Sequence, residues 1–159
     1  MNMVKIYGAD GNKFGHSDDD AIERFWRGLL GGAASLRFHR PPAGLGLNAL
    51  AQANLRSARL FLAEVDVFSS MPDAAHNWLR GREENSVYAC QYAGGKTALY
   101  FPRADEALVL IGDEVRVRWL DILESVWQTA SVREPQDGVI RLTVPGDDHW
   151  LVLLEPIND

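Results

Sequence analysis

The chain lacks most of the features that would assign it to a specialised class of protein. Only one of its 159 residues is a cysteine, Cys90, so an internal disulfide framework is excluded. A net charge of −6 and the absence of any basic run argue against a nucleic-acid-binding surface. No apolar run reaches the roughly 20 residues that a membrane span needs, and the N-terminus has no signal-peptide pattern. The sequence therefore predicts neither a nucleic-acid partner nor a membrane partner.

What the chain does contain is typical of a globular protein with a core. Hydrophobic residues make up 47% and charged residues 24% of the sequence, which fits neither a disordered nor a membrane protein. Folding a chain of this length buries roughly 70% of its extended surface. Cys90 lies in an apolar alternation, which favours a buried and unreactive thiol.

The clearest local signal is a capped helix from Ser17 to Leu30. Ser17 can cap the first turn, the carboxylates of 18–20 suit the positive end of the helix dipole, and Gly31-Gly32 favour a stop. Five apolar residues recur at helical spacing on one face: Ile22, Phe25, Trp26, Leu29 and Leu30. The face must pack against something, and we expect Phe25, Trp26 and Leu29 to be exposed and to favour self-association if nothing covers them.

Strands are predicted on both sides of this helix, and a second helix follows. Met3 to Tyr7 is a strand candidate, and Ala33 to Arg40 alternates, with Leu36 and Phe38 on the face opposite Arg37 and His39. Apolar spacing predicts a helix from Asn48 to Ala63. Residues 1–70 are thus interpreted as a β-α-β-α unit with parallel strands, which needs neighbouring strands to be complete.

The second half of the chain changes to a period of two. We interpret residues 71–85 as a linker with a short helix in 72–79, and residues 86–159 as an antiparallel β-sandwich. Its expected strands are 87–92, 97–101, 107–111, 115–120, 125–130, 139–144 and 150–154. The predicted fold class is α+β.

Several stretches together resemble a known family. Bacterial glycoside-hydrolase-like proteins end their (β/α)₈ barrel with a strand-helix-strand portion similar to VKIYGADGNKFGHSDDDAIERFWRGLLGGAASLRFHRP. Their C-terminal β-domain, usually named for collagen binding, is similar to SVYACQYAGGKTALYFP, VRVRWLDILESVW and VPGDDHWLVLLEP. The resemblance implies that 3–7 and 33–40 correspond to barrel strands seven and eight, with strands one to six absent.

The resemblance also implies a function. The chain is expected to be the C-terminal part of a protein that acts on or binds carbohydrate, without a complete catalytic acid/base pair of its own. The alternative is a non-enzymatic sandwich module that binds carbohydrate or protein. The expected partners are carbohydrate or the missing part of the barrel. Localisation stays open, because a secreted parent protein would carry its signal outside this chain.

Candidate site residues follow the strand ends, where barrel enzymes hold their active sites. Asp10 occupies the position at which resembling enzymes carry a carboxylate nucleophile, usually Glu; the alternative is a turn residue bonded to its own backbone. The candidates for substrate contact here are His16, Arg37, His39 and Arg40. His16 could instead lie at the helix entrance, and the cations of 37–40 could instead form ion pairs.

Three tryptophans of the predicted sandwich suit either a core or a sugar ring. Trp119 and Trp150 are expected in the core, while Trp127, which has polar neighbours, is the candidate for exposure and sugar stacking. The run Asp147-Asp148-His149 could suggest a metal site, but three adjacent residues rarely converge on one ion, and Pro145-Gly146-Asp147-Asp148 is interpreted as a turn. No metal and no cofactor are predicted.

Overall fold

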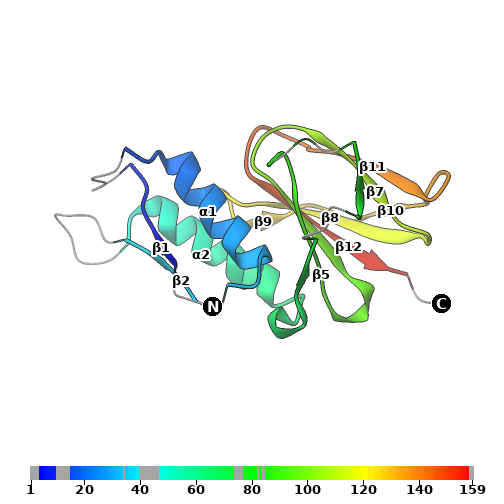
Figure 1. The fold of residues 1–159 in the computed structure, drawn as a ribbon, viewed down its shortest axis with the longest axis horizontal. Coiled ribbons are helices and arrows are strands. Elements are labelled where there is room, and N and C mark those ends of the chain that lie inside the picture. Colours follow the sequence, from blue (N-terminus) through cyan, green and yellow to red (C-terminus); the bar gives the residue numbers. More distant parts are fainter. Residues whose placement is uncertain are drawn as a thin grey trace.

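Two helices separate a small pair of parallel strands from a larger β-sandwich (Figure 1). The computed structural model describes residues 4–9, 15–33, 35–39, 47–73, 77–81, 83 and 85–157. The first half contains, in order, β1 (Val4–Ile6), α1 (Asp18–Leu30), β2 (Leu36–Phe38) and α2 (Ala49–Leu62). β1 and β2 are parallel, in the register Lys5 to Arg37, as the β-α-β-α pattern predicts.

Helix α1 begins and ends where its sequence signals predict. The Ser17 side chain accepts a hydrogen bond from the Asp20 amide, and the Asp20 carboxylate accepts one from the Ser17 amide, which forms a capping box. Gly32 follows the helix with a φ of 71°, a backbone conformation that glycine adopts without strain.

The apolar face of α1 is covered within the chain, so the condition under which its exposure is expected, that nothing covers it, is not met. Phe25, Trp26 and Leu29 are all buried, and they belong to a core shared with α2 and with the large sheet of the sandwich. In an isolated β-α-β-α unit this face would contact solvent, whereas here it packs against the sandwich. Self-association stays a prediction, but it no longer has this surface as its basis.

The apolar face predicted for 48–63 suits packing against either α1 or the sandwich, and helix α2 contacts both. Its first turn is capped by the Asn48 side chain, which accepts a hydrogen bond from the Ala51 amide at 2.9 Å. Asn54, on its buried face, accepts a hydrogen bond from the Trp26 indole at 2.8 Å and donates one to the Leu50 carbonyl at 2.9 Å. A buried polar pair therefore fixes the two helices relative to each other.

The sandwich consists of two antiparallel sheets of unequal size. The large sheet has the order β10-β8-β12-β6-β5-β3, with β9 also paired to β8. Its strands are β3 (Met71–Pro72), β5 (Tyr88–Gln91), β6 (Thr97–Phe101), β8 (Val115–Asp121), β9 (Val126–Trp127), β10 (Ser131–Arg133) and β12 (Trp150–Pro156). The small sheet has the order β11-β7-β4, formed by β4 (Leu79–Arg80), β7 (Glu106–Leu110) and β11 (Val139–Thr143).

Both faces of the large sheet are buried, each by a different layer. Tyr100, Leu151 and Leu153 join the core beneath the helices. Leu99 and Val152, which alternate with them, join the core beneath the small sheet. This explains why β6 and most of β12 consist of buried residues with no polar alternation.

Two sequence-based boundaries need correction. The described part of 71–85, expected as a linker with a short helix, contains β3 and β4 instead, each paired into a sheet; residues 74–76 lie outside the described residues. The expected strand 125–130 is shorter, since only β9 (Val126–Trp127) lies within it, and β10 follows as a strand that was not predicted. The two pair with β8 in registers that differ by one residue. Such an offset is that of a β-bulge.

Apart from the strands and the two long helices, the described residues include two short 3₁₀ turns, Val67–Ser69 and Ala93–Gly95. No helix in the described part of the chain is long and apolar enough to cross a bilayer.

Candidate functional site

The polar face of the β1–β2 pair carries two of the predicted substrate-contacting residues. Leu36 lies against Gly28 of α1, and the Phe38 ring is 5.0 Å from that of Phe25, so both point toward the helix. Arg37 is exposed on the other face, and the His39 ring lies 4.7 Å from that of Tyr7. The predicted alternation is therefore present, with a cation and an imidazole on the side away from the helix.

Of the other three candidates at this end, the structure describes only His16. Asp10 and Arg40 lie outside the described residues, so the roles expected for them stay predictions. His16 is half-buried just before α1, and its Nε2 lies 3.2 Å from an Arg24 guanidinium nitrogen. This contact fits a residue at the helix entrance.

The three carboxylates at the start of α1 each have a separate partner. Asp18 accepts a hydrogen bond at 2.9 Å from the amide of Ala9, in the segment that follows β1. The backbone amide and hydroxyl of Ser17 lower the pKa of Asp20 below its ordinary value of 3.8. Asp19 reaches the sandwich, where its Oδ1 lies 3.1 Å from His149 Nε2. One helical turn therefore connects the end of β1 to the β-sandwich.

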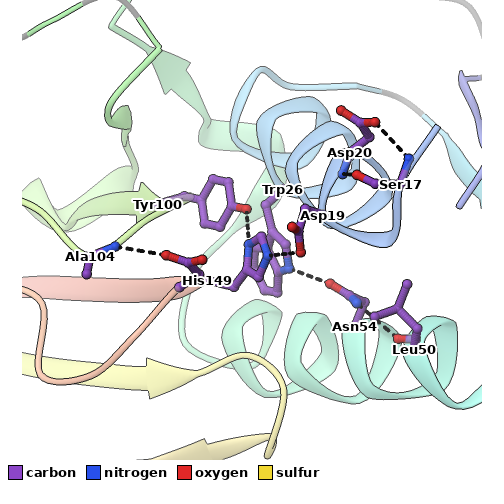
Figure 2. A network of polar contacts seen from close by, with 10 residues as sticks. Ser17, Asp19, Asp20, Trp26, Leu50, Asn54, Tyr100, Ala104 and His149 are labelled. Carbon is purple, nitrogen blue, oxygen red and sulfur yellow. Dashed lines mark hydrogen bonds and ion pairs between the residues drawn. The ribbon is translucent and has the colours of Figure 1, made fainter. Parts of the chain in front are cut away.

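His149 is the centre of this connection, as Figure 2 shows. Its imidazole is buried, and its Nδ1 lies 2.9 Å from the hydroxyl of Tyr100, which is fully buried. Burial raises the pKa of Tyr100, so this hydroxyl stays protonated and can donate to Nδ1. An imidazole with its proton on Nε2 then donates to Asp19, and every polar atom of the network has a partner.

From its sequence position, His149 is a candidate only for a metal site, which the turn predicted for 145–148 makes the less favoured interpretation. The preceding loop does form a bend, and the backbone of His149 itself has a φ of 66°, uncommon for a residue with a side chain. Its partner Asp19 is 130 residues away, and no local pattern predicts that pair.

Trp127 is less available to a ligand than its polar neighbours suggest. It is half-buried, and the Arg118 guanidinium lies 4.7 Å from its ring centroid. Arg118 is itself held by Glu64 at 2.8 Å and lies 3.5 Å from Glu155. A cation fixed in this way covers one face of the indole, although sugar stacking by Trp127 is not tested. Of the other two tryptophans, Trp150 is buried, as predicted, and Trp119 is partly buried against the same core.

Within the described ranges, no group of three or more His, Cys, Asp or Glu side chains could hold a metal ion. Cys90 is buried, and burial raises the pKa of its thiol.

Neither a protein-family model nor a curated protein matches this sequence. Solved structures do match. A glycoside hydrolase is 14% identical with a TM-score of 0.65, over 95% of this chain and 40% of that one. A glycoside hydrolase of family 5 from Bacteroides vulgatus ATCC 8482 is 13% identical with a TM-score of 0.66, over 92% and 38%. The chain has a glycoside-hydrolase-like fold. It spans about two fifths of the length of these proteins.

A third match, from Bacillus halodurans C-125, is 11% identical with a TM-score of 0.52 and covers 99% of this chain and 37% of that chain. Each of these matches covers most or all of the β-α-β-α unit and the sandwich, so both halves of the chain, in this arrangement, are part of the similarity. Nothing in the similarity refers to collagen binding.

Proposed function

We propose that this chain is the C-terminal portion of a carbohydrate-active protein, in which the sandwich holds the last two βα units of a barrel. The observation that carries the proposal is the β1–β2 pair. Within the described residues it is a two-stranded parallel sheet, with no further strand paired to either edge. Parallel sheets are almost always larger and covered on both faces, and a barrel would supply strands to both edges.

The polar face of this pair supports the same proposal. In a barrel, one face of each strand points to the surrounding helices and the other points inward. Ile6 and Phe38 are buried toward α1, whereas Lys5 and Arg37, paired in register, are exposed on the opposite face. Two adjacent cations facing a barrel interior would pair with carboxylates from the remaining strands or from a substrate.

The chain alone is proposed not to hydrolyse glycosides. Most glycosidases need two carboxyl groups on opposite sides of the scissile bond, at a separation fixed by the fold. Asp18 and Asp20 accept hydrogen bonds from backbone amides, and Asp19 is bonded to His149. The start of α1 therefore supplies neither of the two catalytic carboxyl groups. Asp10 remains the candidate for one carboxylate, and the resembling enzymes take the acid from a strand that this chain lacks.

Two measurements test this proposal. The purified chain should show no turnover of aryl glycosides or plant oligosaccharides above buffer; turnover that disappears in Asp10→Asn would overturn the non-catalytic assignment. The genomic DNA upstream of the Met1 codon should encode further βα units in frame, and a stop codon directly upstream would contradict the barrel assignment.

The second candidate is a non-enzymatic binding module. It is favoured by an open cleft at one end of the sandwich, far in the sequence from the β1–β2 pair. Glycan-array binding by a chain with no barrel encoded upstream would favour this candidate over the first.

A further inference from the structure

A cleft of about 220 Å³ opens at one end of the sandwich, between its two sheets. One wall comes from the small sheet, at Trp78 and the end of β7, and the other from the β5–β6 hairpin with the adjoining ends of β8 and β12. It has aliphatic residues at its base, among them Val109 and Val115, which belong to the inter-sheet core.

Trp78 is the aromatic residue of this cleft. Its side chain is half-buried, and the structured part of the chain offers its indole no stacked ring, no cation and no acceptor for the N–H. Trp127, the other half-buried tryptophan considered for sugar stacking, differs because the Arg118 guanidinium lies over its ring at 4.7 Å. Trp26 differs too, since its indole N–H is bonded to Asn54 at 2.8 Å.

Three polar side chains line the same cleft. Gln91 and Thr97 face each other in register across β5 and β6, which places their side chains next to each other on one face of the sheet. That face also carries Leu99 and Phe101 and is otherwise apolar. Thr97 is only 4% exposed, while Asp113 stands exposed at the rim. Among the residues with described positions, none of the three side chains has a hydrogen-bond or ion-pair partner.

We propose that this cleft binds one pyranose ring of a neutral saccharide. An indole suits the apolar face of a sugar ring, and unpartnered amide, hydroxyl and carboxylate groups suit its hydroxyls, which both donate and accept. The cleft is smaller than the roughly 300–1,000 Å³ of pockets for drug-sized ligands, which favours a single ring. The assignment rests on the proposed carbohydrate function and names a subsite for it.

Two larger clefts lined by described residues of the sandwich do not suit a sugar ring in this way. They measure about 340 and 490 Å³, and their lining residues include arginines and carboxylates but no aromatic ring. Part of that charge is already paired, since Arg141 bonds Glu106 at 2.6 Å.

The test uses the full chain labelled with ¹⁵N and titrated with methyl glycosides of glucose, galactose, mannose and N-acetylglucosamine. The chain has 5 tryptophans, so their indole N–H signals report each ring separately. The signal that is missing in Trp78→Phe identifies Trp78. We expect this signal to shift on titration with at least one glycoside, while that of Trp26 stays in place because its N–H is buried and bonded.

Variants separate the site from the fold. Asp113→Ala changes an exposed rim residue and should weaken binding roughly tenfold or more, as expected for loss of a hydrogen bond to a charged group. Trp78→Ala should abolish binding, and Gln91→Ala keeps the assignment testable if Trp78→Ala fails to fold. Asp147→Ala, an exposed position near the opposite end of β12, is the matched control and should bind like the parent.

Several outcomes would overturn the assignment: no shift with any glycoside, a shift of Trp127 rather than Trp78, or binding that survives Asp113→Ala and Gln91→Ala. A shift of Trp78 with a proline-rich peptide but no glycoside would also overturn it, in favour of a peptide cleft. These results are independent of the barrel proposal. If upstream βα units are found but no glycoside binds, the barrel proposal stands and the assignment of the cleft as a sugar site fails. If a glycoside binds in the cleft but no βα units are encoded upstream, the cleft assignment stands and the barrel proposal fails.

Discussion

Replacing His149 should destabilise the chain more through the loss of the Tyr100 hydroxyl's partner than through the loss of the hydrogen bond to Asp19. The buried imidazole bridges Tyr100, in β6, and Asp19, at the start of α1 (Figure 2). His149→Ala removes both contacts. Because Tyr100 is 0% exposed in the parent chain, its hydroxyl then loses its hydrogen-bond partner inside the core, which costs about 1–3 kcal/mol.

The Asp19 side of the bridge contributes less. The Asp19 side chain is 66% exposed, so its carboxylate regains water when the histidine is lost, and such pairs contribute about 0–1 kcal/mol. Adding the hydroxyl and the lost ring packing, His149→Ala should lower the free energy of unfolding by roughly 2–4 kcal/mol.

His149→Asn is the informative companion variant. An asparagine amide can place an acceptor near the position of Nδ1 and tolerates the positive φ of 66°, but it does not reach Asp19. It should therefore cost about 1 kcal/mol, well below the alanine variant. Tyr100→Phe made together with His149→Ala should recover part of the loss, because it removes the unsatisfied hydroxyl.

Urea unfolding followed by far-UV circular dichroism measures these differences. Asp147→Ala, exposed and two residues away, is the control and should stay within about 0.5 kcal/mol of the parent. Equal losses for His149→Ala and His149→Asn, or no recovery in the double variant, would refute the assignment of the cost to the Tyr100 hydroxyl.

The remaining predictions concern the helix cap and the cores. Ser17→Ala removes the cap of α1 and should lower the free energy of unfolding, measured in urea, by about 1 kcal/mol. The control Ser131→Ala, at an exposed sheet edge, should leave that free energy unchanged. Because the pKa of Asp20 is lowered in the folded state, its contribution to stability is present above its ordinary pKa of 3.8 and is lost as the pH falls through the folded value. Asp20→Asn should therefore flatten the acid side of a stability-against-pH curve, and an unchanged curve would contradict the capping role. Trp150→Ala should cost roughly 3–5 kcal/mol and Trp127→Ala clearly less, since Trp150 is 7% exposed and Trp127 is half-buried at the surface; equal small losses would refute the core assignment.

The features predictable from sequence were those specified locally. The cap at Ser17 and the periodic apolar residues of α1 and α2 lie within a few positions of one another, and they give both helices to within one residue. Antiparallel hairpins such as β5–β6 are local in the same sense. Parallel pairing of β1 with β2 followed from the β-α-β order.

The features that depend on partners far away in the sequence could not be predicted. β3 and β4 have only two residues each and exist because a longer strand pairs with them, so no periodicity marks them. The residues that cover Trp26 lie on α2 and on β6, so the segment of α1 alone does not show that its apolar face is covered. For the candidate site, the alternation of Arg37 and His39 was predictable, whereas the His149 bridge and the partners of Asp18 and Asp19 were not.

The large sheet, with one face beneath the helices and the other beneath the small sheet, limits how this chain can be divided or reused. Cutting before residue 86 would expose Tyr100, Leu120, Leu151 and Leu153, which now form the floor of the helical layer. It would also remove β3 and β4 from the sheet edges that they cover. A sandwich fused to another protein without residues 1–85 would thus have one exposed apolar face on the large sheet and one newly unpaired edge on each sheet. This combination favours aggregation. For protein engineering, the unit to transfer as one piece begins before α1.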